Sequence, residues 1–167
     1  LNKMILDNFA KNRLNPYCLP PTDFMSGNKP IISKIKEIRK IAESNLVPIS
    51  YGDALWYGQK KSYILSGDRI MSILAKILRP RLSIFVLNVD GLYSDFKTKS
   101  LIYDMKGNQA SIHDIPMDVT GGMKRKVEEA STIANMGLKV FFVNGNKPQR
   151  IVDAIQKNKF EGTVFRG

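Results

Sequence analysis

Apolar residues recur along the chain at two spacings, and these spacings predict where helices and strands lie. Intervals of three and four residues, typical of amphipathic helices, occur in residues 1–13, 30–45, 67–77, 120–135 and 148–156. Short continuous apolar runs, typical of buried strands, occur in residues 46–50, 62–66, 81–93, 138–145 and 162–165. Because strands alternate with longer helices, the pattern predicts an α/β fold in which an open, largely parallel sheet lies between helices on both faces.

Prolines and glycines mark the expected ends of several elements. Pro30 suits the first turn of the second helix, in which isoleucines at positions 31, 35, 38 and 41 form the buried stripe. Residues 52–58 are expected as a loop, and the polar residues 94–118 are expected to contain a small hairpin. Gly137 is expected to end the long helix.

The composition fits one globular domain or two small lobes, since 43% of the 167 residues are hydrophobic and 25% are charged. There are 26 Lys and Arg against 15 Asp and Glu, so the net charge is +11, which favours an anionic partner. The cations are spread along the chain, as at Lys34, Lys36, Arg39 and Lys40, which favours solvated helix faces over a nucleic-acid groove. We therefore expect a small phosphorylated ligand and no nucleic-acid or membrane partner.

Several enzyme classes are disfavoured by the residue types present. The one cysteine is Cys18 and the one histidine is His113, so a Cys/His metal cluster cannot form, and a Ser-His-Asp site would have to use His113, which we expect in a surface loop. The sequence contains neither a G-x-x-x-x-G-K-[ST] loop nor a G-x-G-x-x-G fingerprint. It also has no apolar run of about 18 residues and no leader pattern, so we expect a reducing, cytoplasmic compartment.

Four predicted strands end in loops that combine Gly with Asp or Asn. These loops are Gly52-Asp53, Ser66-Gly67-Asp68, Asn88-Val89-Asp90-Gly91 and Asn144-Gly145. Such pairs are also common in ordinary turns. However, ligands of open α/β sheets bind at the carboxyl ends of strands, and glycine leaves backbone N–H groups accessible to phosphate. The four loops are therefore expected at one sheet edge, as a phosphate-binding site.

The segments VPISYGDA, YILSGDRIMSILAKILRP, SIFVLNVDGLY, DVTGGMKRK, VFFVNGNKP and GTVF, in this order, resemble the amino acid kinase superfamily and, within it, the isopentenyl phosphate kinases. The resemblance extends from Asn15 to Gly167. It implies transfer of the γ-phosphoryl group of ATP, with Mg²⁺, to isopentenyl phosphate in isoprenoid biosynthesis. It also implies an acceptor lobe at residues 1–80 and a nucleotide-binding lobe at residues 81–167, and it allows a homodimer.

The resemblance implies a role for each matching residue. Asp68 would orient the catalytic lysines, and Lys126 would stabilise charge on the transferring phosphoryl group, although Lys126 could instead be a solvated helix charge. The nucleotide would contact Asn88, Asp90, Gly91, Tyr93, Thr120, Gly121, Gly122, Asn144, Gly145 and Lys147. The acceptor would lie near Gly52, Asp53, Ser66 and Gly67. Tyr93 is as well explained as a packing tyrosine at a strand end.

The chain departs from the family pattern at several positions, and these bear on the acceptor more than on the fold. It contains no Lys-x-Gly-Gly-Ser strand and no histidine in a Gly-rich loop, and it begins inside a predicted helix. Arg69 follows the Gly-Asp pair where the family usually has an acidic residue, and Trp56 and Tyr57 stand where another acidic residue is often found. We therefore expect this stretch of chain by itself to have little kinase activity.

Other functions remain open at this point. Within the superfamily, the alternatives are kinases of fosfomycin, uridylate, acetylglutamate or carbamate. A second class is a non-catalytic structural or regulatory module, and a third is a nucleic-acid binder, for which duplex affinity would fall steeply with salt.

Overall fold

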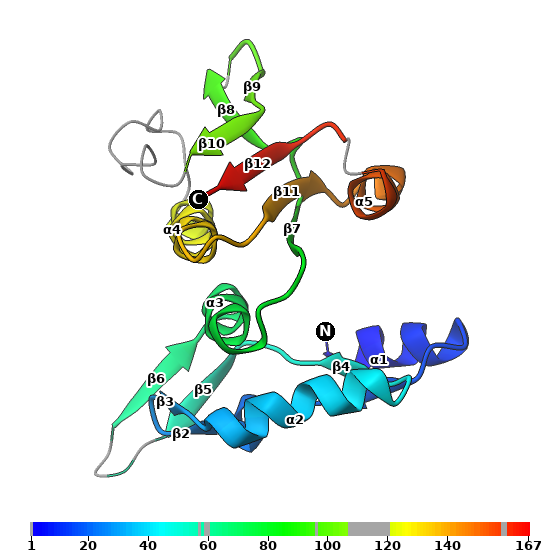
Figure 1. The fold of residues 1–167 in the computed structure, drawn as a ribbon, viewed down its shortest axis with the longest axis vertical. Helices are drawn as coiled ribbons and strands as arrows, with labels where there is room; N and C mark the ends of the chain where they lie inside the picture. Colours follow the sequence, from blue (N-terminus) through cyan, green and yellow to red (C-terminus); the bar gives the residue numbers. More distant parts are fainter. Residues whose placement is uncertain (1, 57, 59–60, 96, 107–120, 158–159) are drawn as a thin grey trace. The chain divides into compact units, whose positions relative to one another are not determined.

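The computed structural model describes residues 2–56, 58, 61–95, 97–106, 121–157 and 160–167. It divides the chain into two compact units, Leu1–Leu78 and Arg79–Gly167, drawn in Figure 1. Among the described residues, no helix is both long and apolar enough to cross a membrane.

The first unit contains three α-helices and three two-stranded pairings among its described residues. In chain order its elements are α1 (Asn2–Lys11), β1 (Pro16–Cys18), the 3-10 helix η1 (Pro21–Asp23), β2 (Met25–Ser26), β3 (Lys29–Pro30), α2 (Ile32–Glu43), β4 (Val47–Ile49), β5 (Asp53–Trp56), β6 (Ser62–Leu65) and α3 (Gly67–Leu78). β1 and β4 pair in parallel, whereas β2–β3 and β5–β6 are antiparallel. Its core includes Phe24 and Ile35, both fully buried, which cluster with Ile38, Leu65 and Ile70.

The second helix begins later than the proline signal predicts. Pro30 pairs with Met25 in the β2–β3 hairpin, and the Ile31 N–H donates to the Phe24 carbonyl at 2.8 Å. The hairpin thus holds Pro30 in extended backbone, and α2 starts at Ile32. The expectation of Pro30 in the first turn was therefore wrong.

The expected loop at residues 52–58 is in part a strand. Asp53 to Trp56 pair with Leu65 to Ser62, so β5 and β6 form a hairpin. Leu55 and Leu65 are buried, whereas Trp56 and Ile64 are 72% and 80% exposed. A Gly-Asp start and a nearby glycine are typical of a turn, but the apolar partner strand draws residues 53–56 into the hairpin.

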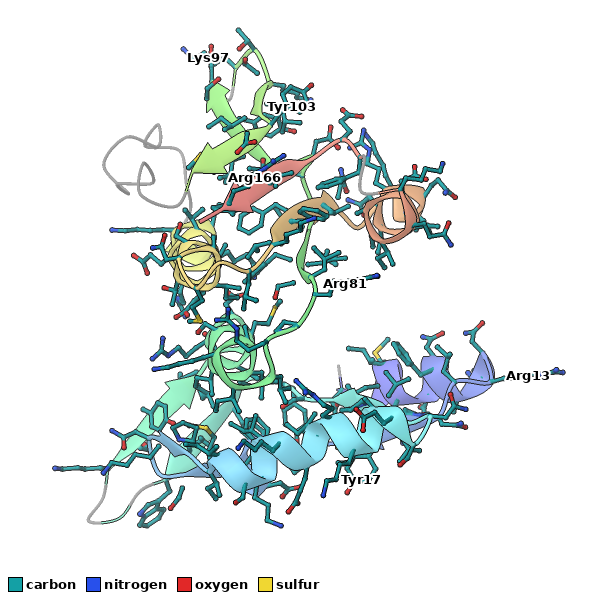
Figure 2. All side chains as sticks on the ribbon, viewed as in Figure 1. Arg13, Tyr17, Arg81, Lys97, Tyr103 and Arg166 are labelled. Atoms are coloured by element: carbon teal, nitrogen blue, oxygen red, sulfur yellow. The ribbon has the colours of Figure 1, made fainter. Side chains whose placement is uncertain are left out.

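The second unit contains one four-stranded sheet. Its elements are β7 (Ser83–Leu87), β8 (Leu92–Asp95), β9 (Ser100–Ile102), β10 (Asp104–Lys106), α4 (Gly121–Ala134), β11 (Val140–Asn144), α5 (Pro148–Gln156) and β12 (Thr163–Arg166). The strand order is β10-β12-β11-β7, in which β10–β12 and β11–β7 are parallel and β11–β12 is antiparallel. β8 and β9 form a small hairpin that begins at Leu92, two residues before the stretch in which one was expected, and Figure 2 shows Lys97 at its outer end.

Helices lie on both faces of this sheet, as the sequence predicts (Figure 1). On one face, Phe141 and Val143 of β11 form a buried cluster with Ala154 of α5. Phe142 points the other way and contacts Phe85 and Phe165, with ring centroids 5.3 and 4.7 Å away. α4 packs against β11 and β12, and four of its residues are fully buried, namely Val127, Ala130, Ile133 and Ala134. β11 is therefore a central strand buried from both sides, which explains its uninterrupted apolar sequence.

Candidate nucleotide and acceptor loops

Asp90 is the centre of a polar cluster at the carboxyl ends of β7 and β11. Its Oδ1 accepts hydrogen bonds from Asn144 Nδ2 at 2.7 Å, from Lys147 Nζ at 3.1 Å and from Arg150 Nη1. Lys147 Nζ also contacts Oδ2 at 3.3 Å. Arg150 donates through its other terminal nitrogen to Glu161, just before β12. One carboxylate thereby connects the loop after β7 with the start of α5.

The same contacts set the charge state of Asp90. The hydrogen bond from Asn144, followed by those from Lys147 and Arg150, lowers the pKa of Asp90 to about 2 from an ordinary 3.8, although partial burial acts in the opposite direction. Asp90 is therefore ionised at neutral pH, and its negative charge is balanced by two neighbouring cations.

The loop after β11 lies directly against the loop after β7. The Gly145 N–H donates to the Leu87 carbonyl at 2.8 Å, and the Asn146 amide side chain donates to the Asn88 carbonyl at 3.4 Å. A Cβ atom on Gly145 would lie 2.5 Å from Val86 Cγ1, so glycine allows this close approach. The structure thus brings Asn88 to Gly91 together with Asn144, Gly145 and Lys147.

Thr163 fixes the far end of the Asn88–Gly91 loop. Its side chain is fully buried, and its Oγ1 accepts from the Leu92 N–H at 2.9 Å and donates to the Ile102 carbonyl at 2.6 Å. A Cβ atom on Gly91 would lie 2.6 Å from the same oxygen. Tyr93, predicted near the nucleotide, accepts from the Asp90 N–H through its hydroxyl at 3.3 Å.

The first unit brings together the other two loops. A Cβ on Gly52 would lie 3.0 Å from the Leu65 carbonyl oxygen and 3.2 Å from the Gly67 nitrogen, so Gly52 packs against the backbone at the start of α3. Ser66 Oγ accepts from the Arg69 N–H at 3.2 Å and so caps α3. Asp53 has a local role, since its Oδ1 accepts from the Ala54 N–H at 2.8 Å.

The predicted catalytic residues lie near the N-terminal ends of two helices, Asp68 in the first turn of α3 and Lys126 in the second turn of α4. Asp68 is half-buried at the second position of α3, in the first unit. Lys126 is half-buried on α4, in the second unit, whereas its neighbours Lys124 and Arg125 are exposed. Gly121 and Gly122 begin α4, while Thr120 and His113 lie outside the described residues.

The four loops do not share one sheet edge, which corrects the sequence-based expectation. β4 pairs with β1 and β6 pairs with β5, whereas β7 and β11 belong to the four-stranded sheet. The loops are therefore assembled as two pairs, one in each unit.

Three residues of the cluster were missed by the sequence reasoning: Arg150, Glu161 and Thr163. Arg150 and Glu161 lie outside any Gly-Asp or Asn-Gly loop, and Thr163 looks like an ordinary strand residue. Their partners are 60, 11 and 71 residues away in the sequence, respectively. The one signal available in the sequence was that two basic residues, Lys147 and Arg150, lie three positions apart at the start of a predicted helix.

Within the described residues, no group of three or more His, Cys, Asp or Glu side chains could hold a metal ion. Asp90 is also a poor ligand for a cation, because two cationic side chains already contact its carboxylate.

Comparison with known proteins identifies relatives of this chain. The amino acid kinase family model matches residues 1–144. The isopentenyl phosphate kinase of Thermoplasma acidophilum is 32% identical over 99% of this chain and 68% of its own length. That of Methanocaldococcus jannaschii is 30% identical over 97% of this chain and 62% of its own length. A crystal structure of the T. acidophilum isopentenyl phosphate kinase product complex matches with a TM-score of 0.77 and 27% identity, over 98% of this chain and 64% of that one. The chain thus spans about two thirds of the length of these relatives.

Proposed function

Because the chain belongs to the amino acid kinase family, we propose that it acts as an isopentenyl phosphate kinase. In this reaction the bond between the γ-phosphorus of ATP and its bridging oxygen breaks, and a phosphate oxygen of isopentenyl phosphate bonds to that phosphorus. ADP leaves with the electron pair of the broken bond, and isopentenyl diphosphate forms.

The observation that carries this proposal is the similarity to relatives named isopentenyl phosphate kinase. Three of them are 26–32% identical over 97–100% of this chain. The similarity therefore includes both units and both pairs of loops, rather than a nucleotide-binding part alone.

In the proposal, the second unit binds ATP. The Asn88–Gly91 loop, Tyr93, the segment 120–122, Asn144, Gly145 and Lys147 line the nucleotide. The contacts between the loops after β7 and β11 support this assignment, because they bring backbone and amide groups of both segments to one place. Glycine at position 145 permits the close approach of these two loops, because a Cβ atom there would meet Val86.

Asp68 and Lys126 are the proposed catalytic residues. Phosphoryl transfer depends on positioning and on neutralising charge at the transferred group, and a lysine aimed at that group supplies the second effect. Lys126 suits this role better than Lys124 because Lys126 is half-buried, and a less hydrated ammonium interacts more strongly with a phosphate. Asp68 would hold the catalytic lysines in line.

Magnesium has a limited place in the proposal. Mg²⁺ in nucleotide sites keeps several water molecules and is held largely by phosphate oxygens with one or two carboxylates. Since Asp90 is occupied by Lys147 and Arg150, it is not proposed as a ligand. The roles assigned to this chain are therefore those of its lysines, amides and backbone groups.

The acceptor is proposed to lie at Gly52, Asp53, Ser66 and Gly67, and to be a small phosphorylated molecule. The close approach of Gly52 to the start of α3 supports this, since the first N–H groups of a helix favour a phosphate. We further propose that the enzyme works in the cytoplasm and as a homodimer.

The proposal is tested by phosphorus NMR on the protein as its gene encodes it, with ATP, Mg²⁺ and isopentenyl phosphate. We expect isopentenyl diphosphate and ADP in equal amounts. Parallel reactions contain fosfomycin, uridylate or N-acetylglutamate as the acceptor. A faster reaction with one of these compounds would assign a different substrate. Failure of every acceptor in a folded protein that binds ATP would contradict the kinase assignment.

A further inference from the structure

Two cations contact the same carboxylate of Asp90, but they differ in how firmly they are held. Lys147 is 49% exposed and contacts Asp90 through one ammonium group. Arg150 is 14% exposed and uses its two terminal nitrogens on two different carboxylates, those of Asp90 and Glu161. A forked guanidinium with two anionic partners is fixed in orientation, whereas a solvated lysine can rotate away at little cost.

Their positions in the chain add to this difference. Arg150 lies in the first turn of α5 and connects the loop after β7 with Glu161, two residues before β12. Lys147 precedes the helix, next to the exposed Asn146. If Lys147 leaves Asp90, the carboxylate keeps the hydrogen bond from Asn144 and the ion pair with Arg150. Asp90 thus stays paired and in place without Lys147.

We propose that Arg150 is a positioning residue, which retains Asp90 while Lys147 exchanges this carboxylate for a phosphate group of the bound nucleotide. The inference rests on the proposed function, because it takes the ligand at these loops to be a nucleotide. Arg150 does not touch the ligand. Its effect is to weaken the hold of Asp90 on Lys147, since a carboxylate shared by two cations binds each of them less strongly than one alone.

This arrangement predicts a specific pattern of affinities. The probe is inorganic tripolyphosphate, which has no base or ribose, and its binding to the chain is measured by calorimetry. Lys147→Gln should weaken binding about two- to fivefold, the range of one partly solvated ion pair. Asp90→Asn should strengthen binding, and this gain should be larger in the presence of Lys147 than in the Lys147→Gln background.

Arg150→Gln provides the decisive measurement. Without Arg150, Asp90 holds Lys147 more tightly, so tripolyphosphate affinity should fall about two- to fivefold even though Lys147 is unchanged. Adding Asp90→Asn to Arg150→Gln should restore the affinity. If Arg150 merely stabilised the fold, a second substitution in the same cluster would not restore binding.

Glu161→Gln is the matched control, because it restores the same net charge as Asp90→Asn and affects the other partner of Arg150. It should not restore the affinity of the Arg150→Gln protein. Thermal unfolding of every variant confirms that the protein tested is folded, and Arg150→Lys serves as the milder replacement if Arg150→Gln unfolds.

Equal rescue by Asp90→Asn and Glu161→Gln would overturn the inference, as would wild-type affinity in Lys147→Gln or absence of tripolyphosphate binding. The outcome is separate from that of the kinase assay. If the protein phosphorylates isopentenyl phosphate but Lys147→Gln binds tripolyphosphate as tightly as the wild type does, the inference is contradicted and the proposed function stands. If the predicted pattern of tripolyphosphate affinities is found but no acceptor is phosphorylated, the inference stands and the proposed function is contradicted.

Discussion

The two pairs of strand-end loops are held together by different kinds of contact. In the second unit, the loops after β7 and β11 are joined by side chains, chiefly through Asp90, Asn144, Lys147 and Arg150. In the first unit, Gly52 packs directly on the backbone of Leu65 and Gly67. Side-chain contacts can be exchanged for contacts with a ligand, whereas backbone packing leaves no room for an added atom. The first pair should therefore be sensitive to volume, whereas the second, in which Gly145 also approaches Val86 closely, should in addition be sensitive to charge.

The largest expected effect concerns the lysine proposed to act on the transferring phosphoryl group. Lys126→Ala should reduce the rate of phosphoryl transfer by a factor corresponding to about 2–4 kcal/mol, because the stabilisation it removes grows in the transition state. Lys124→Ala, two positions away and exposed, is the matched control and should retain nearly the wild-type rate. The measurement is kcat under saturating ATP. Similar rates for both variants would remove Lys126 from the mechanism.

The next effect tests the packing of the first pair. Gly52→Ala should lower the free energy of unfolding by about 1–3 kcal/mol, because the new methyl group meets backbone atoms that side-chain rotation cannot move. Gly67→Ala is the control, since a Cβ there meets nothing within 4 Å. It should be neutral or stabilising by up to about 1 kcal/mol, through a less flexible unfolded chain. Urea unfolding of both variants measures the difference, and equal stabilities would show that Gly52 is not tightly packed.

The smallest effect tests the charge at the second pair. Because the folded-state pKa of Asp90 is lowered to about 2 from 3.8, its ionised form stabilises the fold at pH values above 3.8. This contribution should disappear as the pH falls from 3.8 through 2. We expect the ionised carboxylate to contribute about 1 kcal/mol to the free energy of unfolding. This is less than the full pKa shift implies, because Asp90 is 26% exposed and solvent screens its ion pairs with Lys147 and Arg150.

The measurement for Asp90 is the difference in unfolding free energy between wild type and Asp90→Asn, from pH 7 down to pH 2. The other acidic residues titrate in both proteins and cancel in the difference. The difference should be constant down to about pH 5 and then decrease. A difference that does not vary with pH would mean that the contacts of Asp90 do not depend on its charge.

Local sequence signals were sufficient for most elements of the fold. Pro148 and Gln156 were predicted as the limits of a helix, and α5 has these bounds, since a proline at the first position and an apolar periodicity are both local features. β11 was recognisable because a strand buried on both faces is apolar throughout. Pro30 was wrongly predicted in the first turn of a helix because it pairs with Met25 in the β2–β3 hairpin. This pairing depends on contacts across a turn, which the local helix signal does not include.

The candidate site was predictable in its glycines and less so in its ion pairs. A glycine in a strand-end loop has a local meaning, so Gly52 and Gly145 could be selected by position alone. The contact of Arg150 with Asp90 spans 60 residues, and nothing in the spacing of charges specifies such a pair. For the same reason, the separation of the loops into two pairs depended on which strands were neighbours, and hydrophobic patterns do not encode that.

The buried hydroxyl of Thr163 has a consequence for the order in which parts of the protein can fold during synthesis. This hydroxyl accepts a hydrogen bond from the Leu92 N–H, 71 residues earlier in the chain, and donates a hydrogen bond to the Ile102 carbonyl. At about 5–20 residues per second, the ribosome needs roughly 4–14 s to make the intervening residues. During this interval the Leu92 N–H lacks its native partner, and the loop ahead of it cannot reach its final shape. A nascent chain released before residue 163 would therefore contain every proposed nucleotide-binding residue, yet it should bind the nucleotide weakly.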